Sequence, residues 1–212
     1  MRKLLISILA SLFVASYANA GSLSGLYFEL GTSAVGVEMD GGYNDDNGDI
    51  SSGTVGKTAV TGSYGLGFMT SRERPFSLDL GWASHPGAAK IKTVSDNTST
   101  DVSFEVSDVT EIYLAAMANI TEDASVYIKY GTNDADVTVT GDINNPGDLS
   151  GTTVALGTVM SWGSNMYIRT EAGRTDYDSV KATGKGTNIG TDESVTADPD
   201  VSYGKIAIGF KF

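Results

Sequence analysis

The chain has 212 residues, of which 14 are Lys or Arg and 26 are Asp or Glu, giving a formal net charge of −12. This acidic balance argues against nucleic acid as a partner, because binding phosphates requires clustered Lys and Arg. The sequence contains no cysteine, which excludes a disulfide framework and a thiolate metal site.

The first 20 residues have the pattern of a secretory signal peptide. Arg2 and Lys3 precede an apolar run over residues 4–14, and Ala18 and Ala20 are small at the two positions that signal peptidase inspects. The run is too short for a retained membrane helix. We therefore expect residues 1–20 to be cleaved and residues 21–212 to form one domain.

From residue 26 onward, apolar residues recur at every second position, which is the period of a β-strand. Polar clusters rich in turn-forming residues separate eight such segments. In chain order they cover residues 26–37, 54–68, 76–82, 102–118, 126–131, 154–162, 166–173 and 205–212. The third segment meets "HPGAA" and resumes as "KIKTV". In the fourth segment Phe104, Val106 and Ile112 all fall on even numbers, so we expect them to share the apolar face.

The connections between these segments alternate in length. The links after the second, fourth and sixth segments are short, whereas those after the first, fifth and seventh are longer and richer in acidic residues and glycine. The link after the third segment is short, as this comparison requires, only if residues 90–106 form a hairpin. This alternation is typical of an up-and-down barrel in an outer membrane. A further hairpin within residues 180–195 would raise the number of strands from eight to ten.

The four prolines agree with this assignment, because proline cannot donate to a sheet ladder. We expect Pro75, Pro86, Pro146 and Pro199 to lie in turns, in loops or at the outer ends of strands.

The apolar face of the predicted strands carries aromatic residues near strand ends. Two aromatic girdles, one at each membrane interface, are expected of transmembrane barrels. The alternative is the ordinary core of a soluble β-sandwich. The aromatic residues are Phe68, Phe76, Trp82, Tyr130, Trp162 and Phe212.

The opposite face carries charges of both signs in the middle of strands. Isolated buried charges are costly and paired ones are tolerated, and side chains alone can fill an eight-stranded barrel. We therefore expect a near-neutral plug of four acids and four bases; the alternative is the solvated face of a sandwich. The predicted network is Glu29, Asp79, Glu111, Glu171, Lys129, Arg169, Lys205 and Lys211. Glycines on this face leave room for it: Gly31, Gly65, Gly67, Gly81, Gly131, Gly157 and Gly209.

The chain ends in "KIAIGFKF", in which Ile206, Ile208, Phe210 and Phe212 alternate with small or charged residues. Together with the signal peptide, this ending resembles that of small outer-membrane β-barrel proteins of Gram-negative bacteria, of the OmpA-transmembrane-domain, OmpX or OmpW type. The resemblance implies an all-β fold, an eight-stranded antiparallel up-and-down transmembrane β-barrel with both termini in the periplasm. It also implies that the barrel assembly machinery recognises these four residues. The chain stops at the last strand, so no cell-wall tether is expected.

Some barrels of this general group are lipid A-modifying enzymes that use Ser and His. Here the single histidine, His85, follows Ser84 directly, so their side chains should point to opposite faces of a strand. We expect no enzyme activity and no cofactor. The acidic loop with Asp45, Asp46 and Asp49 lacks EF-hand spacing, and we expect it to be solvated rather than a metal site.

The expected function is structural or surface-interactive, in membrane integrity or adhesion, by a monomer in contact with outer-membrane lipid and lipopolysaccharide. The hairpin over residues 90–106 would offer a backbone edge to a partner. Lys90, Lys92, Lys181 and Lys185 could contact lipid phosphates, although scattered surface lysines are ordinary. The alternatives are a narrow channel for small solutes or ions and, less favoured, a soluble secreted β-sandwich.

Overall fold

The computed structural model describes residues 25–44, 50–70, 74–87, 89–92, 103–187 and 189–212. The expected signal peptide and the acidic loop with Asp45, Asp46 and Asp49 lie outside these residues. The strands are β1 (Gly25–Asn44), β2 (Ile50–Met69), β3 (Phe76–His85), β4 (Ala89–Lys92), β5 (Ser103–Asn119), β6 (Ala124–Thr140), β7 (Leu149–Trp162), β8 (Met166–Tyr177), β9 (Val180–Thr183) and β10 (Ser194–Lys211).

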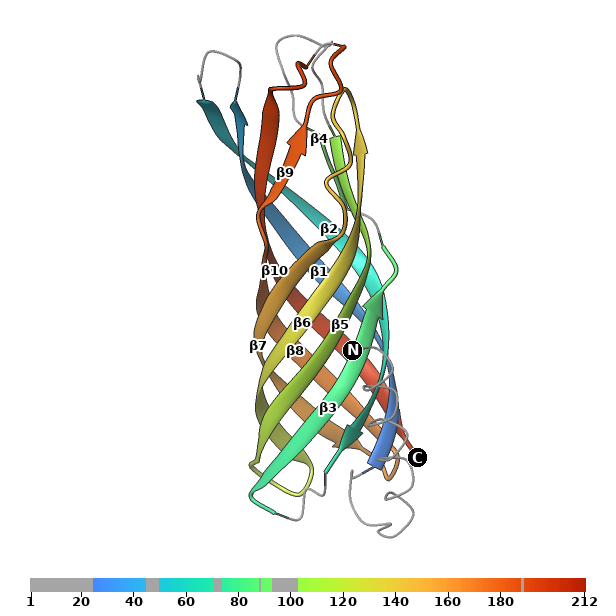
Figure 1. Ribbon diagram of the computed structural model, residues 1–212. Helices are drawn as coiled ribbons and strands as arrows, with labels where there is room; N and C mark the ends of the chain where they lie inside the picture. The colour runs from blue at the N-terminus through green and yellow to red at the C-terminus, as the bar shows by residue number, and fades with distance from the viewer. Residues whose placement is uncertain (1–24, 45–49, 71–73, 88, 93–102, 188) are drawn as a thin grey trace.

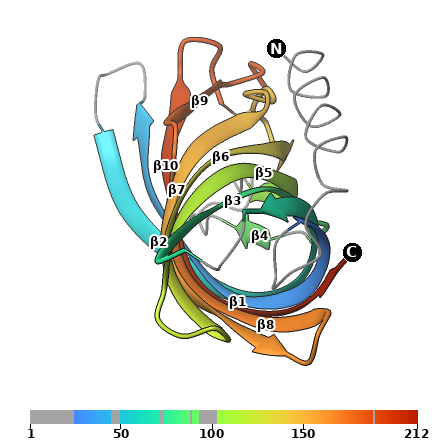
Figure 2. The ribbon, with the colours of Figure 1, turned by 90° about the horizontal axis from the view of Figure 1, so that it is seen from below.

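These ten segments occupy eight positions in a closed antiparallel barrel (Figures 1 and 2). The first and last strands pair from Tyr27 opposite Lys211 to Asn44 opposite Ser194, so the sheet closes on itself. Two positions consist of two consecutive segments: β3 and β4 both pair with β5, and β8 and β9 both pair with β10. The structure therefore confirms the eight-stranded up-and-down barrel.

The hairpin considered within residues 180–195 exists, but it adds no wall strand. Val180 to Thr183 pair with Ser194 to Ala197, so β9 and the start of β10 extend the wall beyond β8. In the same way, β4 and β5 form the hairpin expected over residues 90–106, with Lys92 opposite Ser103.

The prolines mark the irregular positions. Pro86 follows the last residue of β3, and the N–H of Gly87 donates to the carbonyl of His85, which ends that segment. The expectation for Pro199 is wrong, because it lies inside β10, opposite Met39 of β1. On the other side of β10, residues 200–210 pair with β8 and residues 194–197 pair with β9. Pro199 lies in the gap between these two ladders, where a missing N–H is tolerated.

The turns at residues 120–123 and 163–165 lie at one end of the barrel, with the start of β3 and the C-terminus (Figure 1). We call this the short-turn end. The opposite, long-loop end carries the last residues of β1, the first residues of β2, the pairing of β4 with β5, and the connections at residues 141–148, 184–187 and 189–193.

A β-bulge in β5 changes which side chains face inward. Ser107 lies opposite Asp136 and Thr110 opposite Asp134, so two residues of β5 face a single residue of β6. Asp108, with φ of 51°, occupies this bulge. The expectation that Phe104 and Val106 share the outward face with Ile112 is therefore wrong: Phe104 is only 2% exposed and Val106 faces the interior. The extra residue reverses the alternation.

The barrel reverses its polarity along its axis. On the outside of β6, the exposed Ile128 and Tyr130 near the short-turn end give way to the exposed Asp134 and Asp136. On the inside of the same strand, Lys129 gives way to Val137. The half near the short turns is thus apolar outside and ionic inside, whereas the half near the long loops is charged outside and apolar inside.

Within the described residues, no helix has the length and apolar character that crossing a membrane would require.

Candidate functional site

The ionic interior begins with a cluster around Arg169, a fully buried residue on β8. Its Nε lies 2.8 Å from Glu29 Oε2, and its Nη2 lies 2.7 Å from Asp79 Oδ2. Lys205 Nζ lies 2.7 Å from the other oxygen of Glu29. Two bases thus compensate two acids inside the wall.

A second cluster lies around Lys129 on β6. Lys129 Nζ donates to Glu111 Oε2 at 2.9 Å and to Glu171 Oε1 at 2.6 Å. All three side chains are almost completely buried. The strands β5, β6 and β8 therefore bring together one base and two acids.

Five inward tyrosines fill the space between these charges, and each is the direct cross-strand neighbour of a glycine. A Cβ atom on any of these glycines would collide with the tyrosine ring, so the glycine provides the place in which the ring lies. The pairs are Tyr27 with Gly67, Tyr113 with Gly81, Tyr127 with Gly157, Tyr167 with Gly209 and Tyr203 with Gly173. The glycines predicted to make room for charges thus make room mainly for tyrosines.

The tyrosines hydrogen-bond within each cluster, and two of their rings connect the clusters by cation–π contacts. Lys129 Nζ lies 5.0 Å from the ring centre of Tyr113, and Arg169 Cζ lies 5.3 Å from that of Tyr127. Tyr27 donates to Asp79 at 2.8 Å, and its oxygen lies 2.7 Å from the hydroxyl of Tyr113. Tyr127 and Tyr203 donate to the two oxygens of Glu171 at 2.6 and 2.7 Å. Such a connected network holds each charge in one position and leaves little freedom for rearrangement.

Seven of the eight predicted ionic residues take part in these contacts. The eighth, Lys211, is half-buried at the short-turn end, opposite Tyr27 in the pairing of β10 with β1. The two clusters therefore contain four acids and three bases, rather than the four and four expected from the sequence.

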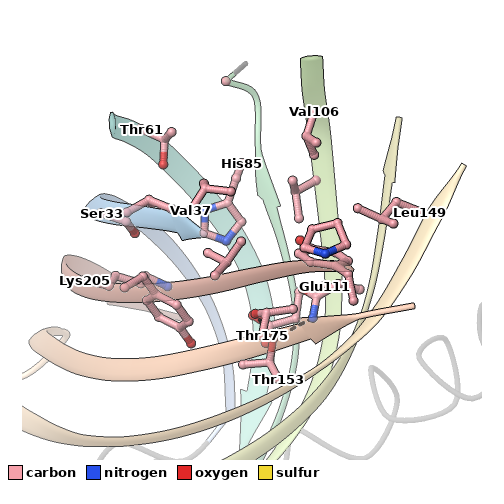
Figure 3. A pocket seen from close by; sticks show the side chains of 18 of the residues that line it. Ser33, Val37, Thr61, His85, Val106, Glu111, Leu149, Thr153, Thr175 and Lys205 are labelled. Carbon is pink, nitrogen blue, oxygen red and sulfur yellow. Dashed lines mark hydrogen bonds between the residues drawn. The ribbon is translucent and has the colours of Figure 1, made fainter. Parts of the chain in front are cut away.

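Above these clusters, toward the long loops, lies a pocket with a cavity of about 100 Å³ (Figure 3). Glu111, Lys129, Glu171, Tyr203 and Lys205 form its ionic side. Most of the surface that its walls expose is apolar, and Figure 3 shows Val37, Val106 and Leu149 around the cavity, together with the hydroxyl side chains of Thr153 and Thr175. The volume is sufficient for several water molecules or for one small organic molecule.

The long-loop side of the pocket is covered by an apolar cap. Ile143, from the connection between β6 and β7, and Ile189, from the connection between β9 and β10, are both buried in one cluster with Leu149. Asp142 Oδ2 joins the two connections, because it accepts the N–H of Thr187 at 3.0 Å and that of Ile189 at 2.8 Å.

One side of the pocket lies where the pairing of the wall is incomplete. Although β2 has 20 residues, it pairs with β3 only over residues 64–69. Thr61, beyond this ladder on β2, and Gly87, just after β3, both line the pocket. Among the described residues, the wall beside the pocket thus lacks a ladder between β2 and β3 at this position.

The residues predicted for the girdle lie on the outer surface. Phe76 and Trp162 are exposed at strand ends beside the short turns, and Trp82 packs edge-on against Tyr64 at 5.8 Å. Tyr130 is also exposed, and Phe68 is half-buried.

The terminal residues close the barrel. Ile206, Ile208 and Phe210 face outward, and the N–H of Phe212 donates to the carbonyl of Leu26 at 3.0 Å.

The two residues considered for catalysis are separated by the wall. His85 lines the pocket and the adjacent Ser84 does not. Among the described residues, no group of three or more His, Asp or Glu side chains could hold a metal ion.

The pocket itself was not predicted, although the sequence contains a signal for it. On the inward face of β1, Glu29 and Ser33 are followed by Val35, Val37 and Met39 at the same parity. Apolar residues change there from even to odd numbers, which indicates that the interior becomes apolar. On β5 the bulge hides the corresponding change.

No protein-family model and no curated protein matches the sequence. The fold is similar to that of the outer membrane protein OprG from Pseudomonas aeruginosa, at 16% identity and a TM-score of 0.60, over 91% of this chain and 98% of that one. It is also similar to the outer membrane protein AlkL, at 15% identity and a TM-score of 0.56, over 92% of this chain and 94% of that one. The chain thus has the fold of the small eight-stranded outer-membrane β-barrels.

Proposed function

We propose that this protein is an outer-membrane barrel that is closed to ions and water-soluble solutes and that binds a small apolar molecule in its long-loop half. The observation that carries the proposal is the reversal of polarity inside the barrel. A connected ionic network fills the half with the apolar exterior, and an aliphatic pocket lies above it. We propose no enzyme activity.

The apolar exterior supports insertion into a bilayer. Leu30, Ile128 and Leu156 are 54%, 53% and 65% exposed on the outer surface. Exposed apolar area costs about 25 cal/mol per Å² in water, and lipid removes that cost. The aromatic residues at Phe76, Trp162 and Trp82 fit interfacial positions. We place the short turns and the C-terminus in the periplasm, as is usual for such barrels.

Closure to ions is tested by conductance across a planar lipid bilayer. Because the network joins charges from β1, β3, β5, β6, β8 and β10, we expect no steady current from the wild-type protein. A steady open current would contradict the proposal and would favour a narrow channel for small solutes or ions.

Binding of an apolar molecule is tested by NMR of Val and Leu methyl groups in lipid nanodiscs, with butyl methyl ether as the probe. We expect saturable shifts at Val37 and Leu149, which line the pocket. Val154 and Leu156 are the internal controls, because they are exposed on the outer surface and report only partition of the probe into lipid. Shifts that do not saturate, or that occur only at the outer residues, would overturn the proposed binding.

A surface-interaction role is the second candidate, and the edge of β2 favours it. Among the described residues, residues 50–63 of β2 pair with β1 but have no ladder to β3. Such an edge can pair with an extended segment of another protein. Adhesion of cells with and without the protein tests this role, and equal adhesion would contradict it.

Assembly and lipid contacts complete the proposal. We propose that the barrel assembly machinery recognises Ile206, Ile208, Phe210 and Phe212, and that the monomer contacts lipopolysaccharide near the long loops. Removal of Phe212 should lower the amount of barrel that shows a shift between unheated and heated gels, whereas an unchanged amount would contradict the assembly role.

A further inference from the structure

We propose that the pocket prefers a small molecule with an apolar tail and an ammonium head group, and that the head group binds Glu111. This inference rests on the proposed binding function and names the class of ligand for the same pocket. Two independent observations at the ionic side of the pocket support the inference. One is the distribution of charge, and the other is a carboxylate oxygen that has no hydrogen-bond partner.

The first observation is that the two ionic clusters differ in net charge. The cluster of Arg169, Lys205, Glu29 and Asp79 has two bases and two acids. The cluster of Lys129, Glu111 and Glu171 has one base and two acids. Ionised carboxylates would therefore leave one negative charge uncompensated, and it would lie in the cluster that lines the pocket. A buried charge without a partner is costly, so this cluster favours an added positive charge.

The second observation concerns the oxygens of the two acids beside Lys129. Glu171 uses both oxygens, because Oε1 accepts from Lys129 and Tyr203 and Oε2 accepts from Tyr127. Glu111 Oε2 accepts from Lys129, but the buried Oε1 of Glu111 has no hydrogen-bond partner in the described structure. An unpaired buried acceptor loses its hydration without replacement. The cluster with the uncompensated negative charge thus also contains the carboxylate oxygen without a hydrogen-bond donor, and that oxygen belongs to Glu111.

The neighbouring strand leaves room for this carboxylate. A Cβ atom on Gly131 of the neighbouring strand β6 would lie 2.7 Å from Glu111 Oε1. Glycine at that site therefore leaves space for the oxygen where it lies.

Six aliphatic side chains of the pocket fit an aliphatic tail. Val35, Val37, Val106, Val109, Leu149 and Val201 line the pocket, and the cap with Ile143 and Ile189 lies beyond. Lys129 and Lys205, the two cations on the ionic side, are already paired with Glu111, Glu171 and Glu29. An ammonium ion beside Glu111 would bring the net charge of the two clusters to zero, which a neutral hydroxyl would not do.

The experiment compares three probes with six non-hydrogen atoms each: pentylamine at a pH that keeps it protonated, pentan-1-ol and butyl methyl ether. Each is titrated into the full protein in nanodiscs, and the methyl shifts of Val37 and Leu149 are followed. We expect pentylamine to bind about tenfold or more tightly than the ether, because hydrogen bonds to charged groups contribute about one to two factors of ten. The alcohol should lie between them.

The variant Glu111→Gln removes the charge and keeps the shape of the side chain. We expect it to abolish the preference for the amine and to leave binding of the ether within about twofold. Asp134→Asn is the matched control, because Asp134 is an exposed carboxylate on the neighbouring strand β6, and this variant should keep the preference. If Glu111→Gln does not assemble, the wild-type protein provides the test. Nuclear Overhauser contacts between the amine's α-methylene and the Glu111 side chain would support the assignment, and their absence would overturn it.

The outcomes separate this inference from the proposed function. Equal affinity for the three probes, or an amine preference that persists in Glu111→Gln, would overturn the assignment to Glu111 and leave the apolar pocket supported. Absence of saturable shifts with every probe would overturn both. An amine preference that Glu111→Gln removes and Asp134→Asn keeps would support both.

Discussion

The two halves of the barrel are built from the same strands and follow opposite rules. Near the short turns, Lys129 and Arg169 lie inside and Leu156 lies outside. Near the long loops, Val37 and Leu149 lie inside and Asp134 and Asp136 lie outside. The medium that touches the outer wall explains the difference, since lipid accepts apolar side chains and water accepts charged ones.

This comparison also separates two ways of holding a closed wall together. The half with the apolar exterior gains nothing by moving its apolar side chains away from lipid, so its interior depends on paired charges and on tyrosines packed against glycines. The half with the charged exterior is stabilised by burial of aliphatic side chains, as in a soluble protein. The pocket lies where the two interiors meet.

The largest expected effect comes from removing the central base. Arg169→Leu should destabilise the barrel by about 3–5 kcal/mol, because Glu29 and Asp79 lose their partner while they stay buried. Unfolding in urea, followed by the shift between unheated and heated gels, measures this. Arg174→Leu is the control: Arg174 makes two ion pairs on the outer surface, where water already screens them, and it should change stability little. Equal losses would contradict the distinction between inner and outer charges.

The next largest effect on stability is expected where an inward tyrosine packs against a glycine. Gly81→Ala should cost about 1–3 kcal/mol, because the added Cβ collides with Tyr113 and displaces it from its contact with Tyr27. Gly62→Ala, on β2, has no atom within 4 Å of the added Cβ and should stabilise by about 0.4–1 kcal/mol. The same unfolding measurement checks both variants, and similar values would show that the rings do not depend on glycine.

Filling the pocket should change stability less, but it should abolish ligand binding. Val106→Phe places a larger side chain in the cavity and should abolish saturable methyl shifts at Val37, with a gain of about 0.5–2 kcal/mol in stability. Val154→Phe adds the same volume on the outer surface and should leave binding unchanged. Binding that survives Val106→Phe would place the ligand outside this cavity.

The smallest effect is expected at a hydroxyl without a partner. Ser63 Oγ is buried with no hydrogen bond in the described structure, so Ser63→Ala should change stability by less than about 0.5 kcal/mol or stabilise slightly. Thr153→Val is the contrast, since Thr153 Oγ1 lies 2.6 Å from Asn133 Nδ2 and 2.6 Å from Thr175 Oγ1, and its loss should cost about 1 kcal/mol or more. A large loss in Ser63→Ala would indicate a bound water molecule or ligand at that hydroxyl.

Much of the wall could be predicted from local pattern. Alternation in the sequence places Ile128 outward and Lys129 inward, and the structure has them so. The pattern fails at Phe104, because a single bulge at Asp108 exchanges the two faces and leaves no strong mark in the sequence. It also fails at Pro199, which was expected in a loop, because the break between β8 and β9 is a property of the neighbouring segments.

The interior could be predicted only in part, because the two side chains of each ion pair come from strands that are far apart in the sequence. Charges on alternate positions predict that acids and bases face one another inside. They do not reveal that Lys129 contacts Glu111 and Glu171, whereas Arg169 contacts Glu29 and Asp79. The register and tilt of the strands decide those distances, and they place Lys211 at the end of the barrel.

By itself, the sequence determined the class of fold and the two faces of the strands near the short turns, because a period of two depends only on neighbouring residues. Tertiary structure alone decided the closure of the pocket, its cap and the unpaired oxygen of Glu111, although the change from even to odd apolar positions on β1 already indicates an apolar interior. These arise where strands far apart in the chain meet across the closed interior, and the positions of such side chains follow from closure of the sheet rather than from any local pattern.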